Sequence, residues 1–169
     1  MSTPIRVGLI GAGYIADWHA DALRATPGVE VTAVCDMRES AARALAEPLG
    51  ARVFTTVAEL IDSKACDAVH ILTPPNIHKD IATQCLTGGL HVLVEKPVAE
   101  SGDETDSIQR AAVEANRKFH PGHNFLGLPS YLRMKEAMTG GDYGRVSSAE
   151  ITWALPLAPL RSGPFNLWL

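Results

Sequence analysis

The sequence has few of the features that mark exported, membrane-spanning or disulfide-bonded proteins. It contains 3 cysteines among 169 residues, an odd number that cannot form a fully paired disulfide framework. We expect Cys35, Cys66 and Cys85 to be reduced core residues of a cytoplasmic protein. No segment approaches the ~18 consecutive apolar residues that a membrane-spanning helix needs. The N-terminus shows no signal-peptide pattern.

An excess of positive charge is also missing. The chain has 15 Lys and Arg against 19 Asp and Glu, which gives a net charge of −4, and the basic residues are scattered. This pattern argues against nucleic acid as a partner. The hydrophobic content of 46% and the charged content of 20% are typical of a globular protein that can bury a core. The length allows one domain and somewhat more.

The most informative feature is a glycine turn between a predicted strand and a predicted helix. The apolar run Val7–Ile10 predicts a buried strand, and a helical pattern starts directly after Gly11-Ala12-Gly13. With Ala16 in the third small-residue position, this is the G-x-G-x-x-A fingerprint of dinucleotide-binding proteins. Gly11 allows the tight turn, and Gly13 lets a pyrophosphate approach the backbone. A βαβ unit that binds no nucleotide is the structural alternative.

The helix after the turn would hold the phosphates with its free N–H groups and its dipole, which adds Tyr14 and Ile15 to the predicted site. The second predicted strand, 30–35, ends at Asp36, at about the spacing expected for the acid that binds the adenosine ribose. A carboxylate there favours NAD because it repels a 2′-phosphate. NADP stays an alternative because Arg38 could pair with a 2′-phosphate or stack on adenine.

Strand and helix patterns alternate as far as residue 124. This alternation predicts a parallel sheet with helices on both faces, the doubly wound Rossmann arrangement of the α/β class. We therefore expect a NAD(P)-binding domain at 1–124. Besides the elements named above, we expect strands at 52–54, 67–72, 91–94 and 119–125, and helices at 39–49, 56–61, 77–86 and 101–118.

The pattern changes after residue 125. We expect a helix at 129–138, a turn at 140–144 and a strand at 145–155, whereas 156–169 shows no clear element. A lone apolar strand would leave an open edge. We therefore expect 125–169 to be the beginning of a truncated α+β domain that serves substrate binding or oligomerisation.

Two further strand ends carry polar residues that packing does not require. The loop at Thr73, Pro74 and Asn76, followed by His78, could run along the cofactor, while Asn76 could equally be the N-cap of the next helix. Glu95 and Lys96 follow the strand at 91–94. A lysine beside a nicotinamide could act as acid and base during hydride transfer, with Glu95 orienting it. A surface ion pair is the alternative interpretation.

These motifs together resemble the glucose–fructose oxidoreductase, inositol dehydrogenase and MocA family (Gfo/Idh/MocA). The resemblance covers essentially the whole chain, and the ordered series is more specific than any single motif. The matching segments are Gly8–Ala16 with His19, Val34–Asp36, Ile71–Asn76 with His78, Val94–Pro97, Gly122–Phe125 and Gly144–Val146.

The resemblance implies an NAD(P)-dependent oxidoreductase that moves a hydride between nicotinamide and a secondary alcohol or ketone of a sugar, polyol or related small molecule. It assigns Lys96 a contact with both the nicotinamide ribose and the substrate, makes His123 a substrate-site candidate and allows a cis Lys96–Pro97 bond. It also implies a homo-oligomer at full length. A non-catalytic dinucleotide-binding module for redox sensing or assembly is the alternative function.

The chain departs from the family pattern in two respects. Family members are roughly twice as long, and their remaining substrate-site Asp and His would lie beyond Leu169. Where the family commonly has an Arg after the His-Asn pair, this chain has Phe125–Pro129.

The remaining histidines and tryptophans invite simpler interpretations. We expect His19 and Trp18 to pack from the first helix, and His70 and His91 to be core or sheet-face residues. His120 and His123 form an H-x-x-H pattern. Pro121-Gly122 keeps this pair off a single helical face and no further ligands complete a set, so we expect no metal site.

Overall fold

The computed structural model describes residues 3–141 and 143–152. The chain divides into two units, Met1–Gly122 and His123–Leu169, and each is described by itself. The first unit is built on one parallel sheet.

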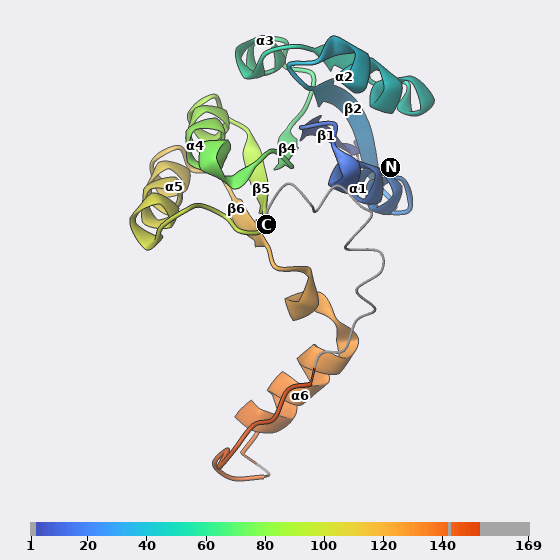
Figure 1. Ribbon diagram of the computed structural model, residues 1–169. Coiled ribbons are helices and arrows are strands. Elements are labelled where there is room, and N and C mark those ends of the chain that lie inside the picture. The colour runs from blue at the N-terminus through green and yellow to red at the C-terminus, as the bar shows by residue number, and fades with distance from the viewer. Residues whose placement is uncertain (1–2, 142, 153–169) are drawn as a thin grey trace. The chain divides into compact units, whose positions relative to one another are not determined.

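In the first unit, a six-stranded sheet has the order β3-β2-β1-β4-β5-β6, and each neighbouring pair of strands is parallel (Figure 1). The chain therefore builds outward from β1 in one direction and then returns to continue from β4 in the other. This confirms the predicted doubly wound Rossmann sheet. The strands are β1 (Ile5–Ile10), β2 (Val29–Cys35), β3 (Arg52–Phe54), β4 (Ala68–Ile71), β5 (His91–Glu95) and β6 (Phe119–Gly122).

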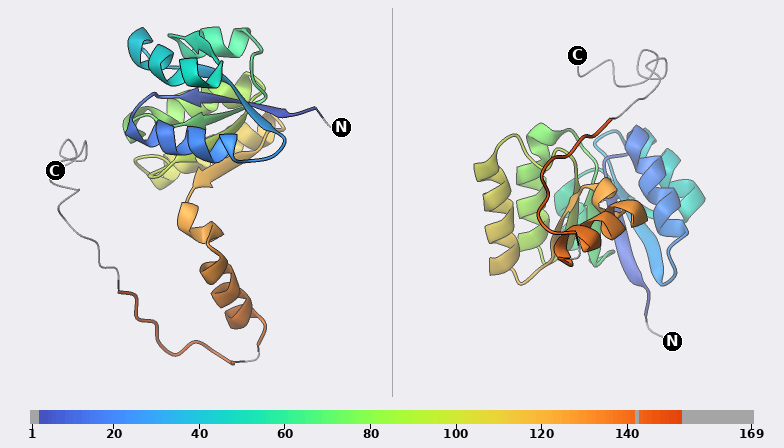
Figure 2. Two further views of the ribbon diagram at one scale, coloured as in Figure 1. Left: turned by 90° about the vertical axis from the view of Figure 1, so that its right-hand side faces the viewer. Right: turned by 90° about the horizontal axis from the view of Figure 1, so that it is seen from below.

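Helices cover both faces of this sheet. The right-hand view of Figure 2 shows the sheet between α1 and the α4–α5 pair. Within the described ranges, no helix is long and apolar enough to cross a membrane. The helices of the first unit are α1 (Tyr14–Arg24), α2 (Glu39–Ala46), α3 (Val57–Asp62), α4 (His78–Thr87) and α5 (Gly102–Glu114), with short 3-10 turns at Glu47–Leu49 and Pro75–Ile77.

Two apolar clusters hold the layers together, one on each face. Leu9 of β1 packs with Ala16 of α1 and Ala42 of α2. On the opposite face, Leu60 of α3 and Ile108 of α5 belong to the second cluster. These five side chains are fully buried. The small side chain at Ala16 lets α1 lie close to β1, as the fingerprint predicts.

The three cysteines are buried and unpaired. Burial raises the pKa of Cys35 and Cys66 to about 11 and that of Cys85 to about 12. At neutral pH they are therefore protonated thiols that behave as small apolar core residues, as predicted.

Several predicted boundaries differ from the structure, and three of these differences affect the candidate site or its surroundings. Helix α5 ends at Glu114 rather than 118, because Asn116 takes a left-handed φ of 50° that a continuing helix cannot accommodate. Strand β6 ends at Gly122 rather than 125, and a 3-10 turn, Asn124–Gly127, follows. Helix α4 begins at His78, after the turn that contains Asn76. Its N-cap is Ile77 with no side-chain cap bond, so the predicted capping role of Asn76 is wrong.

The second unit contains helix α6, Pro129–Thr139, which confirms the helix predicted there. Pro129 occupies its first turn, where a missing N–H is tolerated. The strand predicted at 145–155 does not form over 145–152, because the described chain gives this segment no neighbouring strand to pair with. The remaining three residues of that prediction, and 156–169, lie outside the described residues.

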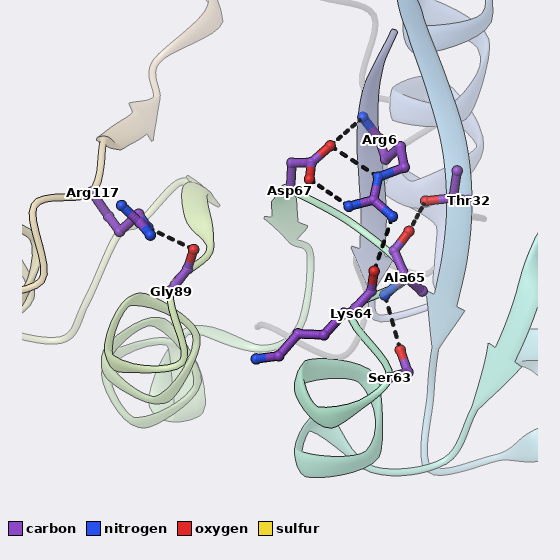
Figure 3. Close-up of polar contacts among 8 residues, drawn as sticks. All are labelled: Arg6, Thr32, Ser63, Lys64, Ala65, Asp67, Gly89 and Arg117. Carbon is purple, nitrogen blue, oxygen red and sulfur yellow. Dashed lines mark hydrogen bonds and ion pairs between the residues drawn. The ribbon is translucent and has the colours of Figure 1, made fainter. Parts of the chain in front are cut away.

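The N-terminal ends of the strands are joined by polar contacts (Figure 3). Arg6 of β1 donates from its side chain to both carboxylate oxygens of Asp67, at 3.1 and 2.6 Å, and to the carbonyl of Lys64 at 3.0 Å. Thr32 of β2 donates to the carbonyl of Ala65 at 2.7 Å. Arg117 donates to the carbonyl of Gly89 at 2.6 Å, just ahead of β5. This edge of the sheet is thus fastened by local contacts.

The Arg6–Asp67 pair predicts a pH-dependent contribution to stability. The hydrogen bond from Arg6 holds the pKa of Asp67 below its ordinary value. A lowered folded-state pKa stabilises the fold above the unfolded-state pKa, and this stabilisation is lost as pH falls through the folded-state pKa. We expect Asp67→Asn to lower the free energy of unfolding near pH 7 by less than about 1 kcal/mol, because the pair is half exposed. In urea titrations the difference should shrink as the pH falls below the ordinary pKa of an aspartate. A difference that grows toward low pH would contradict this assignment.

Candidate functional site

The glycine turn lies where the strand order reverses, between β1 and β4. The N–H of Gly11 donates to the carbonyl of Cys35 at 2.8 Å, and the next turn residues lead directly into α1. Gly11 has a φ of +97°, and a Cβ there would lie 2.9 Å from both the carbonyl carbon and the oxygen of Leu72. Glycine is therefore required by the backbone conformation and by the close approach of the chain after β4.

Gly13 is in the opposite situation. It is the N-cap of α1, it is exposed, and a Cβ placed on it would meet no heavy atom within 4 Å. Nothing in the packing of the described chain requires glycine at this position. The open space in front of the helix N-terminus is therefore a cradle that a side chain would fill. Tyr14 is exposed beside this space, whereas Ile15 is half buried against the apolar cluster that contains Leu9 and Ala16.

Asp36 fastens the glycine turn to the end of β2. Its Oδ2 accepts the N–H of Ala12 at 2.9 Å, and its Oδ1 accepts the N–H of Arg38 at 2.9 Å. The Arg38 guanidinium also lies 3.5 Å from Oδ1, although its side chain is 72% exposed and that of Asp36 only 14%. Oδ2 keeps a second lone pair for a ligand, and Oδ1 becomes available when the exposed Arg38 guanidinium moves aside. The hydrogen bond to Ala12 gives Asp36 a structural role that its spacing in the sequence did not reveal.

The loop after β4 contains a polar atom without a partner. The hydroxyl oxygen of Thr73 is buried and has no hydrogen bond among the described residues. Buried polar atoms are normally satisfied, so an orphan at a candidate site points to a missing ligand or water. Pro74 and Asn76 are exposed on the same loop. Together with the open cradle at Gly13, the orphaned Thr73 hydroxyl fits a site built for an extended polar ligand.

His78 is buried and bridges two of the predicted site segments. One ring nitrogen lies 2.7 Å from the carbonyl of Thr73, and the other lies 3.0 Å from the carbonyl of Pro97. Both neighbours are acceptors, so a neutral ring, which has one N–H, donates to one of them. The ring joins the loop after β4 to the turn after β5.

The turn after β5 presents Lys96 at the surface. The Lys96–Pro97 peptide is cis, as the resemblance allowed. Oε2 of Glu95 accepts the backbone N–H of Lys96 at 3.0 Å. Lys96 is exposed, and among the described residues its ammonium group has no hydrogen-bond or ion-pair partner. It is a cation available to a ligand at the carboxyl edge of the sheet.

Glu95 is held from its other side by histidines that we expected only to pack. Nε2 of His19, on α1, lies 3.3 Å from Oε1 of Glu95, and Nδ1 of His19 lies 2.9 Å from Nδ1 of His70, on β4. Burial, with a smaller effect of the nearby His19 charge, lowers the pKa of His70 to about 4. His19 packs edge-on against His70, with 5.1 Å between the ring centroids, and in addition links His70 to Glu95. No pattern in the sequence signals this contact, because it joins residues of three elements that are far apart along the chain.

Three other predicted residues have different surroundings. Trp18 is 63% exposed and packs on the surface of α1 through an edge-on contact with Tyr14, at 6.4 Å between ring centroids. His91 lies on β5 and accepts the N–H of Lys118 at 2.9 Å. His123 begins the second unit directly after β6, and its side chain is exposed.

Across residues 3–141 and 143–152, no group of three or more His, Cys, Asp and Glu residues is arranged to hold a metal ion.

Known proteins share this arrangement. A family model described as an oxidoreductase family with an NAD-binding Rossmann fold matches residues 5–123. Inositol 2-dehydrogenase of Rubrobacter xylanophilus is 35% identical over 145 residues, which cover 85% of this chain and 42% of that protein. The 1,5-anhydro-D-fructose reductase of Ensifer adhaerens is 31% identical over 159 residues, or 94% and 48% of the two chains. The chain thus spans less than half the length of these two curated relatives.

Solved structures agree with the sequence matches. The WlbA dehydrogenase of Bordetella pertussis, in complex with NADH and UDP-GlcNAcA, superposes with a TM-score of 0.81 at 27% identity, covering 86% of this chain and 42% of that one. GenD2 from gentamicin A biosynthesis, in complex with NAD, gives 0.78 at 32% identity, with 84% and 41% covered. The chain belongs to the Gfo/Idh/MocA oxidoreductase family, whose members share this NAD-binding Rossmann fold.

Proposed function

We propose that the chain is the cofactor-binding part of an NAD(P)-dependent oxidoreductase that acts on a secondary alcohol or ketone of a sugar, polyol or related small molecule. The observation that carries the proposal is the open cradle at Gly13, next to Asp36, at the switch point of a sheet of this family. Ligands of doubly wound sheets bind at this point, outside the carboxyl ends of the strands.

The first half of the site would hold the dinucleotide. The backbone from Gly11 to Gly13 and the first turn of α1, Tyr14 and Ile15, would receive the pyrophosphate through N–H groups and the helix dipole. Asp36 would accept the hydroxyls of the adenosine ribose with its remaining lone pairs, which favours NAD. Arg38, already paired with Asp36, would lie along the adenine and is the residue through which NADP could be accepted.

The second half of the site would hold the nicotinamide end and the substrate. When bound, the nicotinamide supplies a hydride donor or acceptor. The loop at Thr73, Pro74 and Asn76 would line the nicotinamide ribose, where the unpartnered Thr73 hydroxyl could donate or accept. His78 supports this loop, because both its ring nitrogens contact backbone carbonyls.

Lys96 would carry the proton of the reaction. In ketone reduction its ammonium form would donate a proton to the carbonyl oxygen, and in alcohol oxidation its neutral amine form would accept the hydroxyl proton. The exposed ammonium group at the carboxyl edge of β5 supports this role, and Glu95 fixes the backbone at that point. We assign His123 to the substrate site on the family resemblance alone.

The wider setting is also a proposal. We assign 1–124 to the NAD(P)-binding domain and 125–169 to the start of a substrate and oligomerisation domain. We further propose a cytoplasmic protein that forms a homo-oligomer at full length. The three buried thiols suit a reducing compartment. The alternative function, a non-catalytic sensing or assembly module, has no support among the relatives named above, which are dehydrogenases and a reductase.

The two glycines of the turn should respond differently to alanine. Gly13→Ala should fold normally, because its Cβ meets nothing in the chain, and should weaken NADH binding at least about tenfold by filling the phosphate cradle. Gly11→Ala should instead lower the free energy of unfolding by about 2 kcal/mol or more, because of its φ and the Leu72 contact. Urea titration and NADH fluorescence separate the two effects. A Gly13→Ala protein with unchanged NADH affinity would argue against the cradle.

Asp36 should set the cofactor preference. Asp36→Ala removes charged hydrogen bonds to the ribose, so the dissociation constant of NADH should rise roughly 10- to 100-fold, and that of NADPH should rise less. Glu39→Ala is the matched control, because Glu39 is an exposed acid in the first turn of α2. Equal losses for NADH and NADPH would contradict the cofactor preference and leave Asp36 only its structural bond to Ala12.

Lys96→Met should separate binding from turnover. NADH affinity should fall by less than about tenfold, through the loss of the contact with the nicotinamide ribose. In a protein that includes the complete substrate domain, NAD-dependent oxidation of polyols and sugars should slow by about 10²-fold or more, because the proton acceptor is lost. Turnover is followed by the absorbance of reduced nicotinamide. Undiminished turnover in this variant would remove Lys96 from the reaction.

A further inference from the structure

Three ionisable side chains from three different elements form a hydrogen-bonded row behind the Lys96 turn. His70 on β4, His19 on α1 and Glu95 at the end of β5 are linked by contacts of 2.9 Å and 3.3 Å. The His19 and Glu95 side chains are only 17% and 13% exposed. The sheet register places His70 opposite Leu93, so Glu95 lies two residues further along the neighbouring strand.

The chemistry of the groups sets the direction of these hydrogen bonds. An ionised carboxylate only accepts, so Nε2 of His19 must carry the proton that Glu95 receives. A neutral His19 then has a bare Nδ1, which accepts from Nδ1–H of His70. The lowered pKa of His70 agrees with a neutral ring that has a single proton to donate. The row therefore runs from His70 through His19 to Glu95.

Glu95 has few other donors. Among the described residues, its Oε1 is contacted by His19 and its Oε2 by the N–H of Lys96. On the β6 side it faces the backbone at Gly122, where a Cβ would lie 3.4 Å from Oε1 and 2.9 Å from the carbonyl oxygen of Val94. If His19 were lost, one half-buried carboxylate oxygen would be left unsatisfied, which is unfavourable.

We propose that His19 and His70 are positioning residues that fix the carboxylate of Glu95 and, through its second oxygen, the backbone of Lys96. The two carboxylate oxygens of Glu95 have different partners. A carboxylate held by His19 at Oε1 cannot rotate away from the Lys96 N–H at Oε2. His78 contacts the carbonyl of Pro97 from the other side, so the turn is held at both ends. The functional consequence rests on the proposed role of Lys96, whereas the hydrogen-bonded row itself does not.

The first test reads the tautomers directly in the 169-residue chain. In long-range ¹H–¹⁵N spectra at about pH 8, above the ordinary range of imidazole titration, His19 should carry its proton on Nε2. His70 should carry its proton on Nδ1. Assignments come from the His19→Gln and His70→Phe variants. If His70 is protonated on Nε2, or His19 on Nδ1, the row does not exist as proposed.

The second test uses substitutions that separate hydrogen bonding from packing. A glutamine amide offers both an N–H donor and an acceptor oxygen, as the His19 position requires, whereas phenylalanine fills the space of the ring but has neither. We expect His19→Gln to keep the Lys96 amide shift and its protection from hydrogen exchange, with NADH affinity within about twofold. His19→Phe should lose both amide signatures and weaken NADH binding roughly fivefold, the effect of one hydrogen bond. Better retention in His19→Phe than in His19→Gln would overturn the proposal.

Two further variants allow the His19 result to be interpreted. His70→Phe leaves His19 in place, so it should disturb the His19 tautomer and the Lys96 amide even if His19→Phe does not fold. His91→Phe is the matched control, because it removes one hydrogen bond from a half-buried strand histidine that has no contact with Glu95. It should leave the Lys96 amide unchanged. If wild-type protein shows the predicted tautomers and Lys96 amide but binds no NADH, the proposed function fails while the hydrogen-bonded row stands.

Discussion

The close approach of two chain segments at the switch point of the sheet constrains everything else in the site. The backbone at Gly11 passes so near the carbonyl of Leu72 that no side chain fits between them. This contact lets β1 end in a tight turn, and the turn aims the start of α1 at the space above β1 and β4. The cradle at Gly13 and the Thr73 loop are neighbours because of it. A larger residue at Gly11 would separate the two halves of the site.

The N-terminal and carboxyl ends of the strands differ in how their polar groups are satisfied. At the N-terminal ends of the strands, Arg6 and Asp67 satisfy each other, and backbone carbonyls there are capped by nearby side chains. At the carboxyl ends, a buried hydroxyl at Thr73 lacks a partner and the ammonium group of Lys96 is exposed. An unsatisfied buried hydroxyl is unfavourable in a folded protein, so the Thr73 hydroxyl supports the proposed binding site at this edge. The turn that presents Lys96 is restrained by two histidines, because His19 contacts Glu95 and His78 contacts the carbonyl of Pro97.

Periodicity and glycine placement were sufficient to predict the parallel sheet, the glycine turn and the position of Asp36 at the end of the second strand. These features depend on local sequence order. The ends of elements were less predictable, since Asn116 leaves the helical region for reasons that no apolar pattern reveals. The segment at 145–152 alternates like a strand, but alternation supplies no pairing partner. The link from His70 through His19 to Glu95 could not be predicted, because it depends on how α1 sits over β4 and β5. Spacing along the chain shows which face a residue occupies, not which polar group it meets there.

The most direct test of the central claim is a map of NADH binding on the amide spectrum of the ¹⁵N-labelled chain. The account predicts that the largest shift changes follow the carboxyl edge of the sheet, at Gly11–Ile15, Asp36–Arg38, Thr73–Asn76 and the amide of Lys96. The opposite edge, around Arg6 and Asp67, should remain unchanged. Shift changes centred on that opposite edge, or none at the glycine turn at saturating NADH, would contradict the account.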